Sequence, residues 1–216
     1  MAHYKRPKNE EEFQKREAIG VIRASRFIRK FAGSEKLIDV LVINQIHKTI
    51  YKNAWPEIAG VFRGEPVKIT YSSHLISSHL PPHHLDVPVW MMKFNDELVE
   101  KIGKLKSLPM QFRGVKLSKK EQVMVRKIIH TAAWVHHKIV FIHPFVEGNG
   151  RTARLMANTI LERFNLVGIS IQIEKENKNG YRLALSQIDK VGDYRSLEKM
   201  IFDGLVSRYS EINRYK

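Results

Sequence analysis

The stretch His143–Arg154, with the sequence HPFVEGNGRTAR, brings a histidine, a carboxylate, two glycines around an amide and two arginines into twelve consecutive residues. Packing of a core does not require this combination. Gly148 and Gly150 suit a backbone that bends tightly and comes close to a ligand. Free backbone N–H groups that lead into the N-terminus of a helix form an anion site. We therefore interpret this stretch as a phosphate-binding loop.

The charged side chains of this loop suggest chemistry on a bound phosphate. Arg151 and Arg154 are three residues apart, so on a helix they share one face and can bind the same polyphosphate. His143 lies just before the loop, where an imidazole can take a proton from an incoming hydroxyl near neutral pH. Glu147 supplies the hard oxygen that a phosphate-bound Mg²⁺ prefers. The residues predict an active site that handles phosphate.

These twelve residues resemble the signature of the Fic family, H-P-F-x-[D/E]-G-N-G-R-x-x-R, and match it at every specified position. The resemblance implies transfer of AMP from ATP to a Ser, Thr or Tyr hydroxyl of a target protein. It implies that His143 is the general base and that Glu147 binds Mg²⁺. The residues that it implies for nucleotide binding are Gly148, Asn149, Gly150, Arg151 and Arg154, together with Tyr181 near the adenine.

Other reactions stay open beside AMP transfer. Gly150 and Arg154 are intact, which favours AMP transfer, because a family branch that transfers phosphate carries a different residue at that glycine. A phosphocholine-transferring member keeps much of the same signature, so transfer of phosphate or phosphocholine is an enzymatic alternative. The non-enzymatic alternative is a basic binding module without catalysis.

A second segment, about residues 60–82, resembles the flap with which the family aligns its target chain by strand addition. Val61–Tyr71 has β-rich ends around a turn that contains Gly64, which predicts a small hairpin. The residues that the resemblance implies for target docking are Arg63, Val67, Lys68 and Ile69.

Apolar residues at helical spacing predict a mainly α-helical fold, a single Fic-type helical bundle with a small β-hairpin flap. Helices are expected between Asn9 and Gly33, over Glu35–Lys52 and Val87–Leu105, from Ser118 towards Ile139, and over Arg151–Asn165, Asn179–Asp189 and Ser196–Tyr209. His136 is expected to be an interior histidine. We divide the chain into an N-terminal helical extension (1–34), the Fic domain (35–200, with the active-site loop 143–154) and a C-terminal helix (201–216).

Composition limits the class of protein. A chain of 216 residues can bury one sizeable core. Its net charge of +15 favours acidic partners and raises the local concentration of ATP, but the basic residues are scattered, so we expect a solvated basic surface and no nucleic acid. No apolar run approaches the roughly 20 residues of a membrane span. With no cysteine and no evident signal segment, a cytoplasmic location is expected.

The sequence contains no complete match to the inhibitory pattern that many family members carry. Many family members carry an inhibitory helix with the pattern [S/T]-x-x-x-E-[G/N], and the predicted N-terminal helices have no match to it. Ser207–Glu211 fits the first part, but Ile212 stands where Gly or Asn is expected. A separate antitoxin-like protein that supplies the glutamate, or the absence of such inhibition, are the alternatives. The resemblance also implies self-association into a homo-oligomer.

Overall fold

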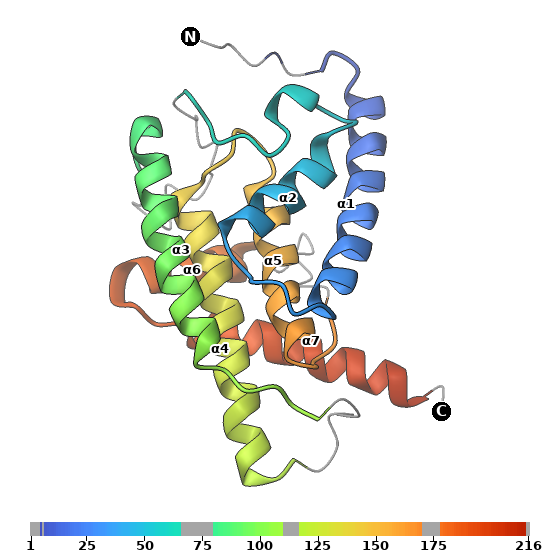
Figure 1. The fold of residues 1–216 in the computed structure, drawn as a ribbon, viewed down its shortest axis with the longest axis vertical. Coiled ribbons are helices and arrows are strands. Elements are labelled where there is room, and N and C mark those ends of the chain that lie inside the picture. Colours follow the sequence, from blue (N-terminus) through green and yellow to red (C-terminus); the bar gives the residue numbers. More distant parts are fainter. Residues whose placement is uncertain (1–4, 6, 66–79, 110–116, 170–177, 215–216) are drawn as a thin grey trace.

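A computed structural model describes residues 5, 7–65, 80–109, 117–169 and 178–214. In Figure 1, α4 and α5 pack side by side in the middle of the molecule, with α1 and α2 on one side of them, α3 on the other and α7 across one end. The α-helices are α1 (Glu10–Ala32), α2 (Val40–Tyr51), α3 (Val87–Gly103), α4 (Lys119–Ile142), α5 (Asn149–Arg163), α6 (Lys178–Val191) and α7 (Arg195–Arg214). Short 3-10 turns, Pro56–Ile58 and His84–Asp86, precede the middle of the chain. The predicted helical fold is confirmed.

Side chains at the helix N-termini explain where several helices begin. Asn9 accepts the N–H of Glu12 and caps α1, and Ser118 forms a capping box with Glu121 at the start of α4, so both helices begin where the sequence predicts. The predicted start of the second helix at Glu35 is wrong, because α2 begins at Val40. The Asp39 side chain accepts the N–H groups of the first turn of α2 and fixes its start there.

The predicted hairpin is not seen in the described residues. Val61–Glu65 forms no strand, and the rest of Val61–Tyr71, with Val67, Lys68 and Ile69, lies outside the described residues. Arg63 explains the difference, because its backbone N–H donates to the carbonyl of Pro144 at 2.8 Å. Within the described residues, the N–H of Arg63 therefore bonds to the loop that follows α4. Within the described residues, no helix has the length and apolar character needed to cross a membrane.

Candidate active site

His143 ends α4 in a left-handed backbone conformation, with φ 52° and ψ 56°. Few residues other than glycine adopt this conformation, and histidine is among those that tolerate it. The N–H of His143 still donates to Ile139 of α4 at 3.0 Å, while its carbonyl accepts the Nε of the buried Arg63 at 2.7 Å. Arg63 also donates through Nη2 to the carbonyl of Pro82 at 2.5 Å. The backbone of His143 is thus fixed by two hydrogen bonds, one from its N–H to α4 and one from Arg63 to its carbonyl.

Asn149 closes the loop with its side chain. Its Oδ1 accepts the backbone N–H of Phe145 at 2.9 Å, and its Nδ2 donates to the Phe145 carbonyl at 2.8 Å. Both residues are buried, so these bonds satisfy backbone groups that water cannot reach. The side chain of Asn149 is therefore committed to the loop, which leaves its backbone N–H as the group that can contact a phosphate.

Replacing Asn149 by alanine should destabilise the protein. The buried N–H and carbonyl of Phe145 would lose their partners, and each unsatisfied group costs about 1–3 kcal/mol, so we expect the free energy of unfolding to fall by about 2–6 kcal/mol. Urea unfolding followed by circular dichroism measures this change. Asn53→Ala is the matched control, because that side chain is exposed, and an equal loss in both variants would contradict the loop-closing role.

A buried histidine on α2, His47, contacts the loop 143–154 through its ring and through a hydrogen bond. The ring of His47 stacks on Phe145 with centroids 3.8 Å apart and 5° between the planes. Its Nδ1 accepts the N–H of Gly60 at 2.9 Å, so Nε2 carries the proton and donates to the carbonyl of Glu147 at 3.0 Å. Burial lowers the pKa of His47 to about 4, which keeps the ring neutral and in this tautomer.

Gly148 is the N-cap of α5 and has φ +79°. A Cβ at this position would lie 2.3 Å from the Tyr51 ring, so the chain passes directly over that ring. No side chain caps the helix, and its first backbone N–H groups point out of the N-terminus. The positive end of α5, begun by Asn149 and Gly150, is therefore suited to an anion.

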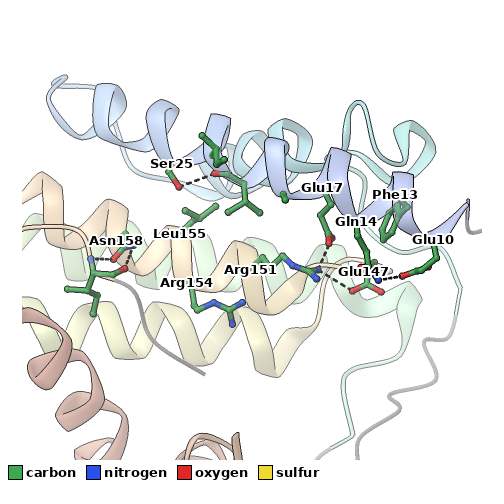
Figure 2. A pocket seen from close by; sticks show the side chains of 14 residues that line it. Glu10, Phe13, Gln14, Glu17, Ser25, Glu147, Arg151, Arg154, Leu155 and Asn158 are labelled. Atoms are coloured by element: carbon green, nitrogen blue, oxygen red, sulfur yellow. Dashed lines mark hydrogen bonds and ion pairs between the residues drawn. The ribbon is translucent and has the colours of Figure 1, made fainter. Parts of the chain in front are cut away.

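Glu147, Arg151 and Arg154 line one open cavity of about 780 Å³ between α1 and α5. Figure 2 shows Arg151 reaching towards Glu17 of α1, while Arg154, one turn further along α5, is directed away from α1. A Cβ on Gly150 would lie 3.4 Å from Nη1 of Arg154, so this guanidinium lies over the first turn of α5. Burial lowers the pKa of Arg154, yet an arginine starts so high that it stays charged. No carboxylate of a described residue forms an ion pair with it.

Tyr181 of α6 raises the pKa of Arg154 electrostatically, by less than burial lowers it. Its hydroxyl is 3.3 Å from Nε2 of His136, and the two rings meet edge to face. His136 is fully buried, as predicted, and burial lowers its pKa to about 3. Tyr181 is half-buried.

Three residues at the site were not singled out from the sequence. They are Glu17 of α1, and His47 and Tyr51 of α2. All three are buried, and Glu17 pairs with Arg151 at 2.7 Å. A charged residue on the apolar stripe of a predicted helix was the signal for Glu17, because such a position requires a partner. His47 and Tyr51 carried no comparable signal, because either ring is also common in an ordinary core.

The helical bundle thus places a glycine-capped helix N-terminus, with two arginines on the following turns, directly after a histidine at the end of the preceding helix, and this arrangement is suited to a phosphate group. The chain belongs to the Fic/DOC family, whose model matches residues 37–161. It is 29% identical over 186 residues to protein adenylyltransferase Fic of Nematostella vectensis, which covers 86% of this chain and 36% of that relative. It is 28% identical over 188 residues to the protein of the same name from Culex quinquefasciatus, covering 87% and 32%. The chain thus spans about a third of the length of these relatives.

Solved structures share the fold. Fic-1 from C. elegans aligns with a TM-score of 0.65 and 22% identity over 97% of this chain and 55% of that chain. The BepC protein of Bartonella tribocorum, solved with bound AMPPNP, aligns with a TM-score of 0.63 and 15% identity over 92% of this chain and 88% of that one.

Proposed function

We propose that this chain is a protein adenylyltransferase, which uses Mg-ATP to transfer AMP to a Ser, Thr or Tyr hydroxyl of a target protein. The observation that carries the proposal is that Glu147, Arg151 and Arg154 line one cavity beside the N-terminus of α5, which directly follows the loop that His143 begins. The name of the curated relatives, protein adenylyltransferase Fic, supports the same reaction.

The polyphosphate would bind along the first turns of α5. Backbone N–H groups of Asn149 and Gly150 would hold the α- and β-phosphates at the positive end of the helix, and that of Gly148 would join them once Glu147 binds the metal ion instead. Arg151 pairs with the phosphate chain, and Arg154 fixes the γ-phosphate. This arrangement sets the α-phosphorus in line for attack, and the fixed positive charges stabilise the departing pyrophosphate. Tyr181, which is half-buried and acts electrostatically on Arg154, is the candidate for contact with the adenine.

Mg²⁺ would be held by Glu147 together with phosphate oxygens. No cluster of three or more metal-binding side chains occurs among the described residues, and Mg²⁺ is commonly bound by one or two carboxylates plus substrate phosphates. The Glu147 carboxylate lines the cavity, and its Oε1 accepts the N–H of Gly148 at 3.1 Å, which places it at the phosphate loop. Bound Mg²⁺ neutralises charge that develops on the leaving pyrophosphate.

His143 would take the proton of the target hydroxyl as the oxygen attacks the α-phosphorus. The bond from that phosphorus to the β-phosphate oxygen breaks, and pyrophosphate leaves. The flap would present the hydroxyl, and Arg63 anchors its base, because its side chain holds the carbonyls of His143 and Pro82. Docking by Val67, Lys68 and Ile69 stays a prediction.

Inhibition by a separate antitoxin-like protein also stays a prediction, as does self-association into a homo-oligomer. Glu211 of the C-terminal Ser207–Glu211 pair forms an ion pair with Arg208 of the same helix, at 2.8 Å.

The transferred group is tested with labelled nucleotide. The purified chain is incubated with Mg-ATP and a protein extract, and we expect label from α-³²P-ATP but not from γ-³²P-ATP to enter protein. Intact-mass spectrometry of the labelled protein should then give the mass of one AMP. Label from the γ-position would identify a phosphotransferase instead, and no label from either position would contradict the proposed reaction.

A further inference from the structure

Glu17 of α1 is a charged residue on a helix face that is otherwise buried and small or apolar. The other members of this face are Phe13, Gly20, Ala24 and Ile28. Glu17 itself is only 5% exposed. A carboxylate in such a position costs several kcal/mol unless a cation or hydrogen bonds compensate it. Its partners therefore indicate why the chain carries it there.

Those partners join three helices at one point. The Tyr51 hydroxyl of α2 donates to Oε1 of Glu17, and burial raises the pKa of Tyr51, which keeps that proton in place. Nη1 of Arg151 on α5 lies 2.7 Å from the same Oε1 and donates to the Tyr51 oxygen at 3.0 Å. A carboxylate oxygen, a hydroxyl and a guanidinium nitrogen thus form a closed triangle, two corners of which Figure 2 shows.

Two close backbone approaches hold this triangle in place. A Cβ on Gly20 would lie 2.0 Å from the carbonyl oxygen of Ile50, so α1 and α2 touch one turn from Glu17 and one residue from Tyr51. On the other side, Gly148 lies against the Tyr51 ring. Tyr51 is therefore fixed by the contact between α1 and α2 and by the contact of its ring with Gly148. Because these contacts are close-packed, its hydroxyl cannot shift unless the loop 143–154 also moves.

The contacts with Glu17 and Tyr51 use only one nitrogen of the Arg151 guanidinium, Nη1. Its contacts with described residues all run through Nη1, including the longer one of 3.7 Å to Glu147. The side chain of Arg151 is 39% exposed and lines the cavity. Because the guanidinium is a rigid fork with five N–H donors, fixing one edge aims the other edge, Nε and Nη2, into the cavity.

We propose that Glu17 and Tyr51 are positioning residues that hold Arg151 in the orientation in which it binds the phosphate chain. The inference rests on the proposed function in that the bound ligand is Mg-ATP. The family model matches residues 37–161 and so does not include α1. If the inference is correct, α1 nevertheless contributes a residue to the nucleotide site. The opposite role for Glu17 is competition, in which its negative charge occupies Arg151 and repels the triphosphate.

The two roles predict opposite signs for one measurement, the dissociation constant for Mg-ATP on the purified chain. If Glu17 positions Arg151, Glu17→Gln should weaken binding about tenfold, since charge-assisted hydrogen bonds contribute more than neutral ones. Tyr51→Phe should weaken binding about threefold, because the ion pair remains while the bridging hydroxyl is lost. Tighter binding by Glu17→Gln would overturn the inference and establish competition.

A second comparison separates positioning from a general effect on folding. In an Arg151→Gln background, Glu17→Gln should change the dissociation constant no further, because the residue through which it acts is gone. A loss equal to that in the natural chain would overturn the inference. Glu12→Gln is the matched control, because this carboxylate lies on the same helix, is exposed and pairs with Arg16. It should bind Mg-ATP like the natural chain.

The same data separate this inference from the proposed function. Binding of Mg-ATP by the natural chain without transfer of label would contradict only the proposed reaction. Binding that Glu17→Gln leaves unchanged would contradict only the positioning role. If the natural chain does not bind Mg-ATP at all, both are overturned.

Discussion

Replacing His143 by asparagine should lower the rate of AMP transfer by about 10²–10⁴-fold, the usual contribution of a general base. Asparagine tolerates the left-handed backbone of this position, φ 52°, so the variant keeps the turn between α4 and the loop while it loses the basic nitrogen. The rate is measured as incorporation of α-³²P into protein at saturating Mg-ATP. Because His143 is expected to act on the target hydroxyl and not on the nucleotide, the dissociation constant for Mg-ATP should stay within about twofold.

His130 provides the control for this prediction. It lies on the same helix, α4, but is exposed and pairs with Glu198 of α7 at 2.6 Å. His130→Asn should therefore transfer AMP at the rate of the natural chain. A His143→Asn variant that retains the full rate would remove this residue from the mechanism, and one that no longer binds Mg-ATP would show that the side chain also shapes the nucleotide site.

Gly148→Ala should be among the most destabilising single substitutions in the chain. An alanine in the left-handed region costs roughly 1–2 kcal/mol. Its Cβ would also lie 2.3–2.7 Å from atoms of the Tyr51 ring, and overpacking of this kind costs about 1–3 kcal/mol more. We expect the free energy of unfolding to fall by about 2–5 kcal/mol. Mg-ATP binding should be lost as well, because the backbone that approaches the phosphates must move.

Substitutions at two other glycines separate the two causes of the expected loss of stability, the left-handed backbone and the contact with Tyr51. Gly192 has φ +68° but nothing within 4 Å of an added Cβ, so Gly192→Ala should show the cost of the backbone alone. Gly103 has neither a positive φ nor a neighbour, and Gly103→Ala should leave stability unchanged or slightly raised. Thermal unfolding should therefore rank the variants as Gly103→Ala, Gly192→Ala and Gly148→Ala, from most to least stable. Equal melting temperatures for the last two would contradict the crowding against Tyr51.

The sequence predicted those features that depend on neighbouring residues. Helix caps at Asn9 and Ser118 follow from side chains that bond the next turn, and the loop residues 143–154 are contiguous, so one short pattern contains most of the site. The exact start of α2 was missed because the apolar spacing extends back beyond Asp39, whose capping bonds override it.

Features that depend on packing between distant segments were not predictable in the same way. His47 contacts the loop across 100 positions of the chain, and Tyr51 reaches Arg151 across the same separation. The sequence predicts a strand at Val61, but the described residues Val61–Glu65 form none, and the N–H of Arg63 bonds to Pro144 in the loop after α4. Local preference cannot indicate such a partner, because a long-range contact depends on how the helices pack and not on the residues beside it.

The pairing of Glu17 with Arg151 has a consequence for how the chain can be shortened. A fragment that starts near residue 37, where the family match begins, would keep every residue of the signature loop. It would nevertheless leave Tyr51 without its hydrogen-bond acceptor and expose the surface of α5 that α1 covers. We therefore expect a fragment without Glu10–Ala32 to be less stable and to bind Mg-ATP more weakly than the full chain.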